Sequence, residues 1–336
     1  MTPDTPDPRL PRPCRVLMLG ATGTAGQATA RALLDAGHEV ACFIRPGTGA
    51  AQDRIATALD GADLRFGDVT DPGSLARDGI RGERFDALVS CLASRTGAPA
   101  DAWAIDHRAH SHALKAAQAA GIRHMVLLSA ICVQKPVLAF QHAKLAFEAD
   151  LIASGLTYSI VRPTALFKSL SGQIERLRQG KPFLVFGDGA LTASKPISDG
   201  DLGRYMAGCL TDPARHNRIL PIGGPGPAIT PLQQGAQLFT LLDREPKFRH
   251  VPVALLDAVH RGLRTLGHIS PKLAAKAELA RIGRYYATES MLVWDPVTKR
   301  YDADATPQTG TETLFDFYAQ LIDGRATIER GAHKVF

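Results

Sequence analysis

Three glycines spaced three residues apart, Gly20, Gly23 and Gly26, are the first residues whose types and spacing indicate chemistry. They lie in "GATGTAG", after the short apolar run "CRVLML" and before the helical pattern "QATARALLDAG". In such a turn the first glycine permits the bend, the second lets the backbone approach a pyrophosphate, and the third allows close helix packing. Free amides at the helix N-terminus bind phosphate oxygens. The spacing predicts a dinucleotide-binding loop, with a plain strand-to-helix turn as the alternative.

The residue at the end of the second apolar run selects between cofactors. An acidic side chain there would bond the ribose 2′-hydroxyl of NAD, whereas this chain has Arg45, in "FIRPG". A guanidinium suits a 2′-phosphate, because its planar fork of donors matches phosphate oxygens. We therefore expect NADP(H), with an arginine on a solvated strand end as the alternative.

Strands and helices must alternate to position these residues. The helical patterns are at residues 27–37 and 104–121. Strand-like apolar runs are at residues 14–20, 38–45, 63–69, 85–94 and 124–130. This alternation implies parallel strands joined by right-handed crossovers. The predicted fold class is α/β, with a Rossmann-type doubly wound parallel sheet.

Composition narrows the class of protein. The 336 residues are 45% hydrophobic and 21% charged, as in ordinary globular proteins, and the net charge of +6 is spread without a basic block. We therefore expect no nucleic-acid partner. Five scattered cysteines without a CxxC pair indicate reduced thiols in a cytoplasmic protein and no metal site. Residues 1–13, rich in proline, are expected to be a disordered leader, and no apolar run is long enough to span a membrane.

Several segments resemble the short-chain dehydrogenase/reductase superfamily in its extended or atypical form. They are "GATGTAG", "GDVTDPGSL", "SCLAS", "LLSAI" and "YSIVRPTALF", and together they fall within residues 14–210. The resemblance implies a Rossmann domain at residues 14–165. It also implies a smaller C-terminal substrate lobe at residues 166–336, from which residues 195–222 return to the main domain.

The resemblance also implies which residues bind the cofactor. The loop residues are Gly20, Thr22, Gly23, Thr24, Ala25 and Gly26, followed by Arg45 for the 2′-phosphate. The residues at the adenine and along the cofactor are Asp68, Val69, Cys91, Leu92, Ala93 and Pro163.

The superfamily carries a catalytic tyrosine and a lysine four residues apart on one helix, so that both face the site. In "AFQHAKLAFEADL" the corresponding residues are Phe140 and Lys144. Lys144 keeps the implied ribose-binding role, whereas the proton transfer of the phenol has no counterpart at Phe140. Ser129 stands where the superfamily has its active-site serine. We expect Glu148 to form an i,i+4 ion pair with Lys144.

A narrower resemblance is to the NADPH-dependent 8-vinyl reductases of chlorophyll and bacteriochlorophyll biosynthesis. It is carried by "FQHAKLAFE", "SIVRPTALFKSLSGQ", "GKPFLVFGDGALTASKPISDGDL", "LPIGGPGPAITPLQQG" and "ESMLVWDP". It implies reduction of the 8-vinyl group of divinyl chlorophyllide, or of its protochlorophyllide precursor, to ethyl. The implied partner is a magnesium tetrapyrrole, and Phe140, Phe167 and Lys168 are expected to contact it.

A vinyl group has no oxygen to protonate, so its reduction does not need the phenol that a carbonyl reductase needs. The alternative is a non-catalytic NADP-binding regulatory or assembly protein of the same fold. Residues 252–285 carry basic residues among leucines and alanines. We expect a packed helix with a solvated basic face there, and peripheral contact with a photosynthetic membrane stays open, as does the oligomeric state.

Overall fold

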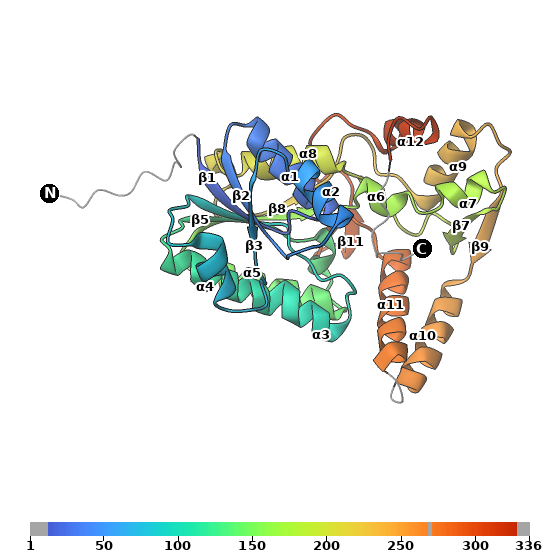
Figure 1. Ribbon diagram of the computed structural model, residues 1–336. Helices are drawn as coiled ribbons and strands as arrows, with labels where there is room; N and C mark the ends of the chain where they lie inside the picture. The colour runs from blue at the N-terminus through green and yellow to red at the C-terminus, as the bar shows by residue number, and fades with distance from the viewer. Residues whose placement is uncertain (1–12, 268–270, 328–336) are drawn as a thin grey trace.

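A seven-stranded, all-parallel sheet forms the main domain of this computed structural model, which describes residues 13–267 and 271–327 (Figure 1). The strands are β1 (Arg15–Leu19), β2 (Glu39–Ile44), β3 (Asp63–Phe66), β4 (Ala87–Ser90), β5 (His124–Leu128), β6 (Thr157–Pro163) and β8 (Arg218–Ile222). Their order is β3-β2-β1-β4-β5-β6-β8, so the winding reverses between β1 and β4. In such sheets ligands bind at the carboxyl ends of the strands beside that reversal. The predicted Rossmann-type fold is confirmed, whereas the predicted leader lies outside the described residues except for Pro13.

Helices cover both faces of the sheet (Figure 1). One face carries α1 (Thr24–Asp35) and α8 (Asp199–Gly208), and the other carries α4 (His110–Ala119) and α5 (Ala139–Ala153). The shorter elements between strands are α2 (Ala50–Ala58), η1 (Leu75–Ile80), α3 (Pro99–Ala102), η2 (Trp103–Ala109), η3 (Ile131–Gln134) and η4 (Pro213–Arg215). Two apolar clusters follow from this arrangement, one between the sheet and α1 and α8, the other between the sheet and α4 and α5. Burial on both faces explains why the strands are almost wholly apolar.

The strands are shorter than the apolar runs predicted, and the difference is at their carboxyl ends. Gly20, Arg45 and residues 67–69 and 91–94 all lie in loops that follow strands. The predicted helix at 104–121 also divides, because η2 is a π-helical turn that precedes α4. Both differences from the predicted elements concern residues at the carboxyl-terminal edge of the sheet, the edge at which sheets of this type bind ligands. Functional sites are a usual place for π-turns.

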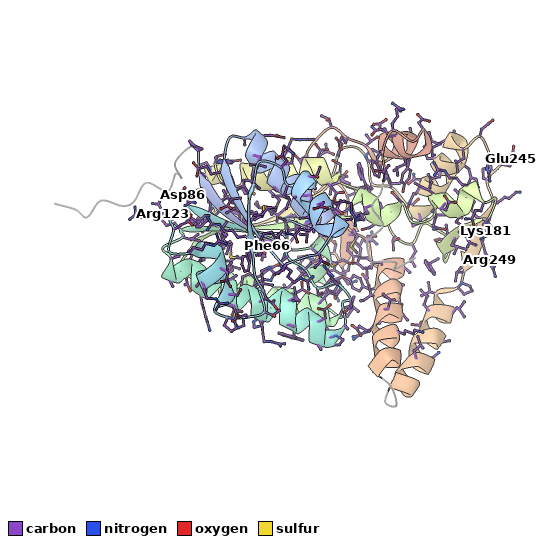
Figure 2. All side chains as sticks on the ribbon, in the orientation of Figure 1. Phe66, Asp86, Arg123, Lys181, Glu245 and Arg249 are labelled. Carbon is purple, nitrogen blue, oxygen red and sulfur yellow. The ribbon has the colours of Figure 1, made fainter. Side chains whose placement is uncertain are left out.

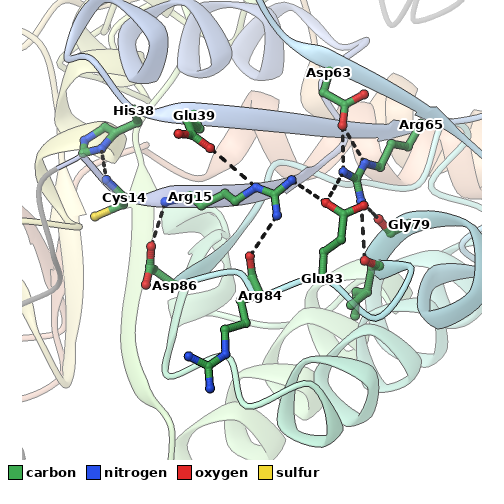
Figure 3. Close-up of polar contacts among 11 residues, drawn as sticks. Cys14, Arg15, His38, Glu39, Asp63, Arg65, Gly79, Glu83, Arg84 and Asp86 are labelled. Atoms are coloured by element: carbon green, nitrogen blue, oxygen red, sulfur yellow. Dashed lines mark hydrogen bonds and ion pairs between the residues drawn. The ribbon is translucent and has the colours of Figure 1, made fainter.

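A charged network closes the opposite, amino-terminal edge of the sheet (Figure 3). Buried Arg65 binds Asp63 at 2.7 Å and Glu83 at 2.9 Å, and donates to the carbonyl of Gly79 at 2.6 Å. Arg15 at the start of β1 also binds Glu83. Arg65 first, and Arg15 second, lower the pKa of Glu83. These charges satisfy one another, which gives them a structural role away from the ligand-binding edge.

A smaller lobe follows β6 (Figure 1). It contains α6 (Phe167–Leu170), α7 (Ile174–Arg178), β7 (Phe183–Phe186), α9 (Pro231–Leu241), β9 (Phe248–Val251) and α12 (Leu314–Ile322). Strands β7 and β9 pair in parallel, and buried Phe183, Leu238 and Tyr318 are part of a separate apolar core. Between these elements the chain returns to the main domain, where α8 covers one face and β8 extends the sheet.

Two long helices, α10 (Val253–Gly267) and α11 (Pro271–Thr288), form a hairpin that projects from the body (Figure 1). The single helical stretch expected at 252–285 is therefore two helices. The C-terminal half of α11 returns to the main domain, where Ile282 and Tyr285 pack against Ile131 and Cys132 in the loop after β5. The two-stranded ribbon β10 (Val293–Asp295) and β11 (Arg300–Asp302) follows. Within the described parts of the chain, no helix combines the length and the apolar character needed to cross a bilayer.

Candidate active site

Two glycines of the first loop are required by the fold itself. Gly20 has a φ of +75°, and a Cβ atom there would lie 2.5 Å from the backbone carbon of Cys91 in the loop after β4. A Cβ at Gly26 would lie 2.1 Å from the carbonyl oxygen of Gly20. Either contact is far inside van der Waals range, so any other residue would push α1 or the loop after β4 out of place. The loops after β1 and β4 meet at the reversal of strand order.

Gly23 differs, because nothing in the protein requires a glycine there. Its φ is −83°, and an added Cβ would have only an ordinary contact, 3.6 Å from the carbonyl oxygen of Gly20. Gly23 precedes α1, whose first amides receive no side-chain cap. Uncapped amides with free space before them form a cradle that a methyl group would partly fill and that an anion suits. The geometry fits the pyrophosphate of a dinucleotide.

Lys168 reaches this loop from the small lobe. Its Nζ donates to Thr24 Oγ1 at 2.7 Å, at the first turn of α1. Asp199, at the start of α8, lies within reach of its charge: burial raises the pKa of Asp199 to about 6, and Lys168 opposes that rise. One carboxylate oxygen of Asp199 is buried without a hydrogen-bond partner in the described chain. Lys168 was expected at the substrate, and its contact instead is with the predicted phosphate loop.

The next two loops present the residues predicted at the adenine and its ribose. Arg45 is exposed directly after β2. Asp68, after β3, accepts hydrogen bonds from the amide and hydroxyl of Thr70, both at 2.8 Å. These bonds lower the pKa of Asp68, and the charge of Arg45 adds to the effect. Val69 and Leu92 pack against the core beneath α4 and α5, which anchors both loops.

Lys144 points from α5 toward η2 and binds Asp106. Its Nζ lies 3.2 Å from Asp106 Oδ1, and the exposed fractions of the two side chains are 11% and 1%. Asp106 Oδ1 also accepts the amide of Ser94, at 3.2 Å, in the loop after β4. Its other oxygen, Oδ2, is buried and unpartnered in the described chain. The carboxylate thus joins Lys144 to a loop predicted to contact the cofactor.

The prediction that Glu148 pairs with Lys144 is wrong. Glu148 is buried and faces β6, where Arg162 binds it through Nη2 and also through Nε at 3.2 Å. Ser129, after β5, donates its hydroxyl to Glu148 Oε1 at 2.5 Å. A guanidinium with two donors serves a buried carboxylate better than a lysine one turn away that leans toward another helix. The hydroxyl proton of Ser129 is therefore directed at Glu148.

The remaining predicted residues have different surroundings. Phe140 is partly buried against a cluster that includes Cys132, Leu138 and Tyr285. Phe167 is buried in the core of the small lobe, with its ring centroid 5.4 Å from that of Phe317. Its ring therefore has a packing role that the expected substrate contact did not anticipate. Pro163 ends β6 opposite Ile222 of β8.

Thiol chemistry is disfavoured at this edge of the sheet. Burial raises the pKa of Cys91 to about 12, and burial also raises the pKa of Cys132. Both side chains stay neutral near pH 7, and a neutral thiol is a poor nucleophile.

Sequence reasoning missed Asp106 and Arg162. Asp106 lies in a π-helical turn, for which the sequence carries no signal, and Arg162 lies within an otherwise apolar strand run. A buried-strand arginine is itself a signal, because a charge in a parallel sheet requires a partner. Glu148, on the neighbouring helix α5, is the acidic partner that Arg162 requires.

The buried pair generates a stability prediction. Replacing Glu148 by alanine leaves Arg162 unpaired under α5, so the free energy of unfolding should fall by about 3–5 kcal/mol in urea titrations. Glu175→Ala is the matched control, since Glu175 has only exposed contacts, an ion pair with Arg178 at 3.9 Å and a hydrogen bond from Gln179 at 3.2 Å, and its loss should cost under about 1 kcal/mol. Equal, small losses in both variants would contradict the structural role assigned to Glu148.

Comparisons with known proteins agree with this geometry. A family described as NAD(P)H-binding matches residues 20–213. Among solved structures, the leucoanthocyanidin reductase–NADPH complex from Vitis vinifera superposes with a TM-score of 0.67 at 17% identity, over 92% of this chain and 99% of that one. This similarity concerns the fold.

Divinyl chlorophyllide a 8-vinyl-reductase from Oryza sativa subsp. indica is 47% identical over 97% of this chain and 83% of its own length. The Zea mays enzyme of the same name is also 47% identical, over 96% and 82%. The chain therefore belongs to the divinyl chlorophyllide a 8-vinyl-reductase family, whose members are oxidoreductases.

Proposed function

We propose that this chain uses NADPH to reduce the 8-vinyl group of a divinyl chlorophyllide, or of its protochlorophyllide precursor, to an ethyl group. The observation that carries the proposal is the combination of a lysine at position 144 with a phenylalanine at position 140. The site retains a buried, positioned lysine and lacks the phenol four residues before it. Membership of a family named for this activity supports the same reaction.

The cofactor would be held by residues from four loops and α5. The open cradle at Gly23 suits the pyrophosphate, Arg45 the 2′-phosphate, and Lys144 the nicotinamide ribose. The contact of Lys168 with Thr24, in the first turn of α1, supports a phosphate-binding role for this lysine rather than one at a substrate carboxylate. When bound, NADPH supplies a hydride. Asp106 fixes the position of the Lys144 side chain, which would hold the ribose.

Reaction at carbon explains the absence of a phenol at position 140. A carbonyl develops charge on oxygen, where a positioned acid contributes about 10²–10⁴-fold. A vinyl group conjugated with a macrocycle instead spreads the charge over the ring system. Phe140 adds a flat apolar surface that suits a planar substrate.

Ser129 has a positioning role in this proposal. Its proton is held by Glu148, so it cannot be the donor without breaking a buried bond of 2.5 Å. Through Glu148 and Arg162 it joins the ends of β5 and β6 to α5. This linkage fixes the position of α5 on the sheet, and with it the positions of Lys144 and Phe140.

Cofactor choice is testable at Arg45. Arg45→Ala removes a charge-assisted contact worth about 1.5–3 kcal/mol, so NADPH should bind about tenfold to a hundredfold more weakly while NADH binding stays unchanged. Fluorescence titration of both nucleotides measures this. Arg123→Ala is the control, since Arg123 is also exposed and lies at the opposite edge of the sheet, before β5 (Figure 2). Parallel losses for NADH and NADPH would contradict the 2′-phosphate assignment.

The reaction itself is testable with pigment. Purified protein with NADPH and divinyl chlorophyllide, kept anaerobic in dim light, should shift the Soret band to the blue as the vinyl group loses its conjugation. Phe140→Tyr should not raise this turnover, because the reacting carbons have no oxygen for that phenol to serve. An unshifted band with intact cofactor would refute the proposed reaction. A large gain in Phe140→Tyr would refute the explanation for the missing phenol.

A further inference from the structure

We infer that Tyr286, on α11, donates the proton that completes the reduction, and so supplies from the helical hairpin the phenol that α5 lacks. This inference rests on the proposed function. It assigns the second hydrogen of the product to a side chain 146 positions further along the chain than Phe140.

Helix α11 brings two phenols to the loop between Ser129 and α5. The first, Tyr285, is committed to structure. Its hydroxyl donates to the carbonyl of Cys132 at 2.8 Å and lies 3.2 Å from that of Lys135, and its ring is 4% exposed. Its proton is used to satisfy buried backbone acceptors. Tyr285 therefore holds α11 on the loop.

Tyr286 is held differently. Its ring lies edge-on to Tyr285, with centroids 5.7 Å apart, and the residue is 38% exposed. Its hydroxyl contacts Sγ of Cys132 at 3.8 Å. A thiol is a weak hydrogen-bonding partner, so turning the phenol proton toward another acceptor costs little. Tyr286 thus combines a partly exposed side chain with a proton that is not committed to a buried backbone acceptor.

The contact with Cys132 places this phenol beside the helix that carries Lys144. Phe140, four residues before Lys144 on α5, packs against the same apolar cluster that contains Cys132 and Tyr285. The Tyr286 hydroxyl and the Phe140 ring therefore approach the same short loop from different elements.

The loop that holds Cys132 is bonded to the segment that follows α11. Lys135, in this loop, binds Glu289 of the following segment at 2.5 Å. Gln134 donates to the carbonyl of Leu292 at 2.5 Å and accepts the amide of Trp294 at 2.8 Å. These bonds, together with that of Tyr285 to Cys132, hold the end of α11 against the loop and so position Tyr286, as a proton donor requires.

The other tyrosines do not reach the site. Tyr301 donates to Glu289 at 2.5 Å, and Tyr318 donates to the carbonyl of Leu170 in the core of the small lobe. Tyr205 lies under Arg215 on α8, on the far face of the sheet from α5 (Figure 1). Tyr158 is the second residue of β6, toward the amino-terminal edge. Of the six phenols in the chain, Tyr286 alone combines a place beside Cys132 with a weakly held proton.

The proton step balances. Addition of the hydride at the terminal vinyl carbon leaves the electron pair of the former double bond on the inner carbon and spread over the macrocycle. The O–H bond of Tyr286 breaks as a C–H bond forms at the inner carbon, and water returns a proton to the phenolate. Burial raises the pKa of Tyr286 well above its ordinary value, so the phenol keeps its proton until the more basic carbanion forms.

The test compares Tyr286→Phe with Tyr285→Phe on divinyl chlorophyllide and NADPH in D₂O. The Tyr286 variant should lose about 10²–10⁴-fold in turnover. The wild-type product should carry one solvent deuterium at the inner carbon in a single configuration, readable by NMR. Residual product from Tyr286→Phe should contain both configurations, because water then protonates either face. Tyr285→Phe should keep a single configuration and lose stability.

NADPH titration separates a catalytic from a structural role. Tyr286→Phe should bind NADPH within twofold of wild type. Wild-type turnover and a single configuration in Tyr286→Phe would overturn the assignment while the proposed function stands. A loss of NADPH binding as large as the loss of turnover would overturn it too. A wild-type protein that leaves the pigment unreduced would instead refute the proposed function.

Discussion

One buried carboxylate on α5, that of Glu148, determines where the chemically important residues lie. It is removed from water between helix and sheet, and such a charge is tolerated only when donors surround it. Arg162 from β6 and Ser129 from the end of β5 provide those donors. Helix α5 is therefore fixed to the two strands beside it. With Glu148 held, Lys144 one turn earlier must face η2, where Asp106 receives it.

The site that results is organised for chemistry at carbon. Its lysine is positioned by a buried carboxylate rather than by a neighbouring phenol, and Phe140 contributes packing surface. The loop that follows Ser129 is closed by α11 and the β10–β11 ribbon, so the C-terminal hairpin is part of the site. This arrangement accounts for a chain that has Lys144 on α5 and a phenylalanine, Phe140, four residues before it. The second hydrogen is then supplied by a distant element, and Tyr286 has the position to supply it.

The fold could be read from local patterns, because each βα unit has its own signal. Apolar runs predicted the strands, and the spaced glycines predicted the turn at Gly20–Gly26. The partners of the charged groups could not be read in the same way. The i,i+4 rule predicted Lys144 with Glu148, but tertiary contacts with Arg162 and Asp106 are stronger than an exposed helical pair. The different surroundings of Phe167 and Lys168 also depend on tertiary structure, because Phe167 is buried in the core of the small lobe and Lys168 contacts Thr24 of α1.

The central claim is that the reaction occurs at carbon, with hydride added to the terminal carbon of the vinyl group. Reduction with NADPH that carries two deuteriums at C4, followed by NMR of the isolated pigment, tests it most directly. The account predicts one deuterium per molecule, in the methyl group of the new ethyl substituent. Deuterium at the inner carbon, or elsewhere on the macrocycle, would contradict it.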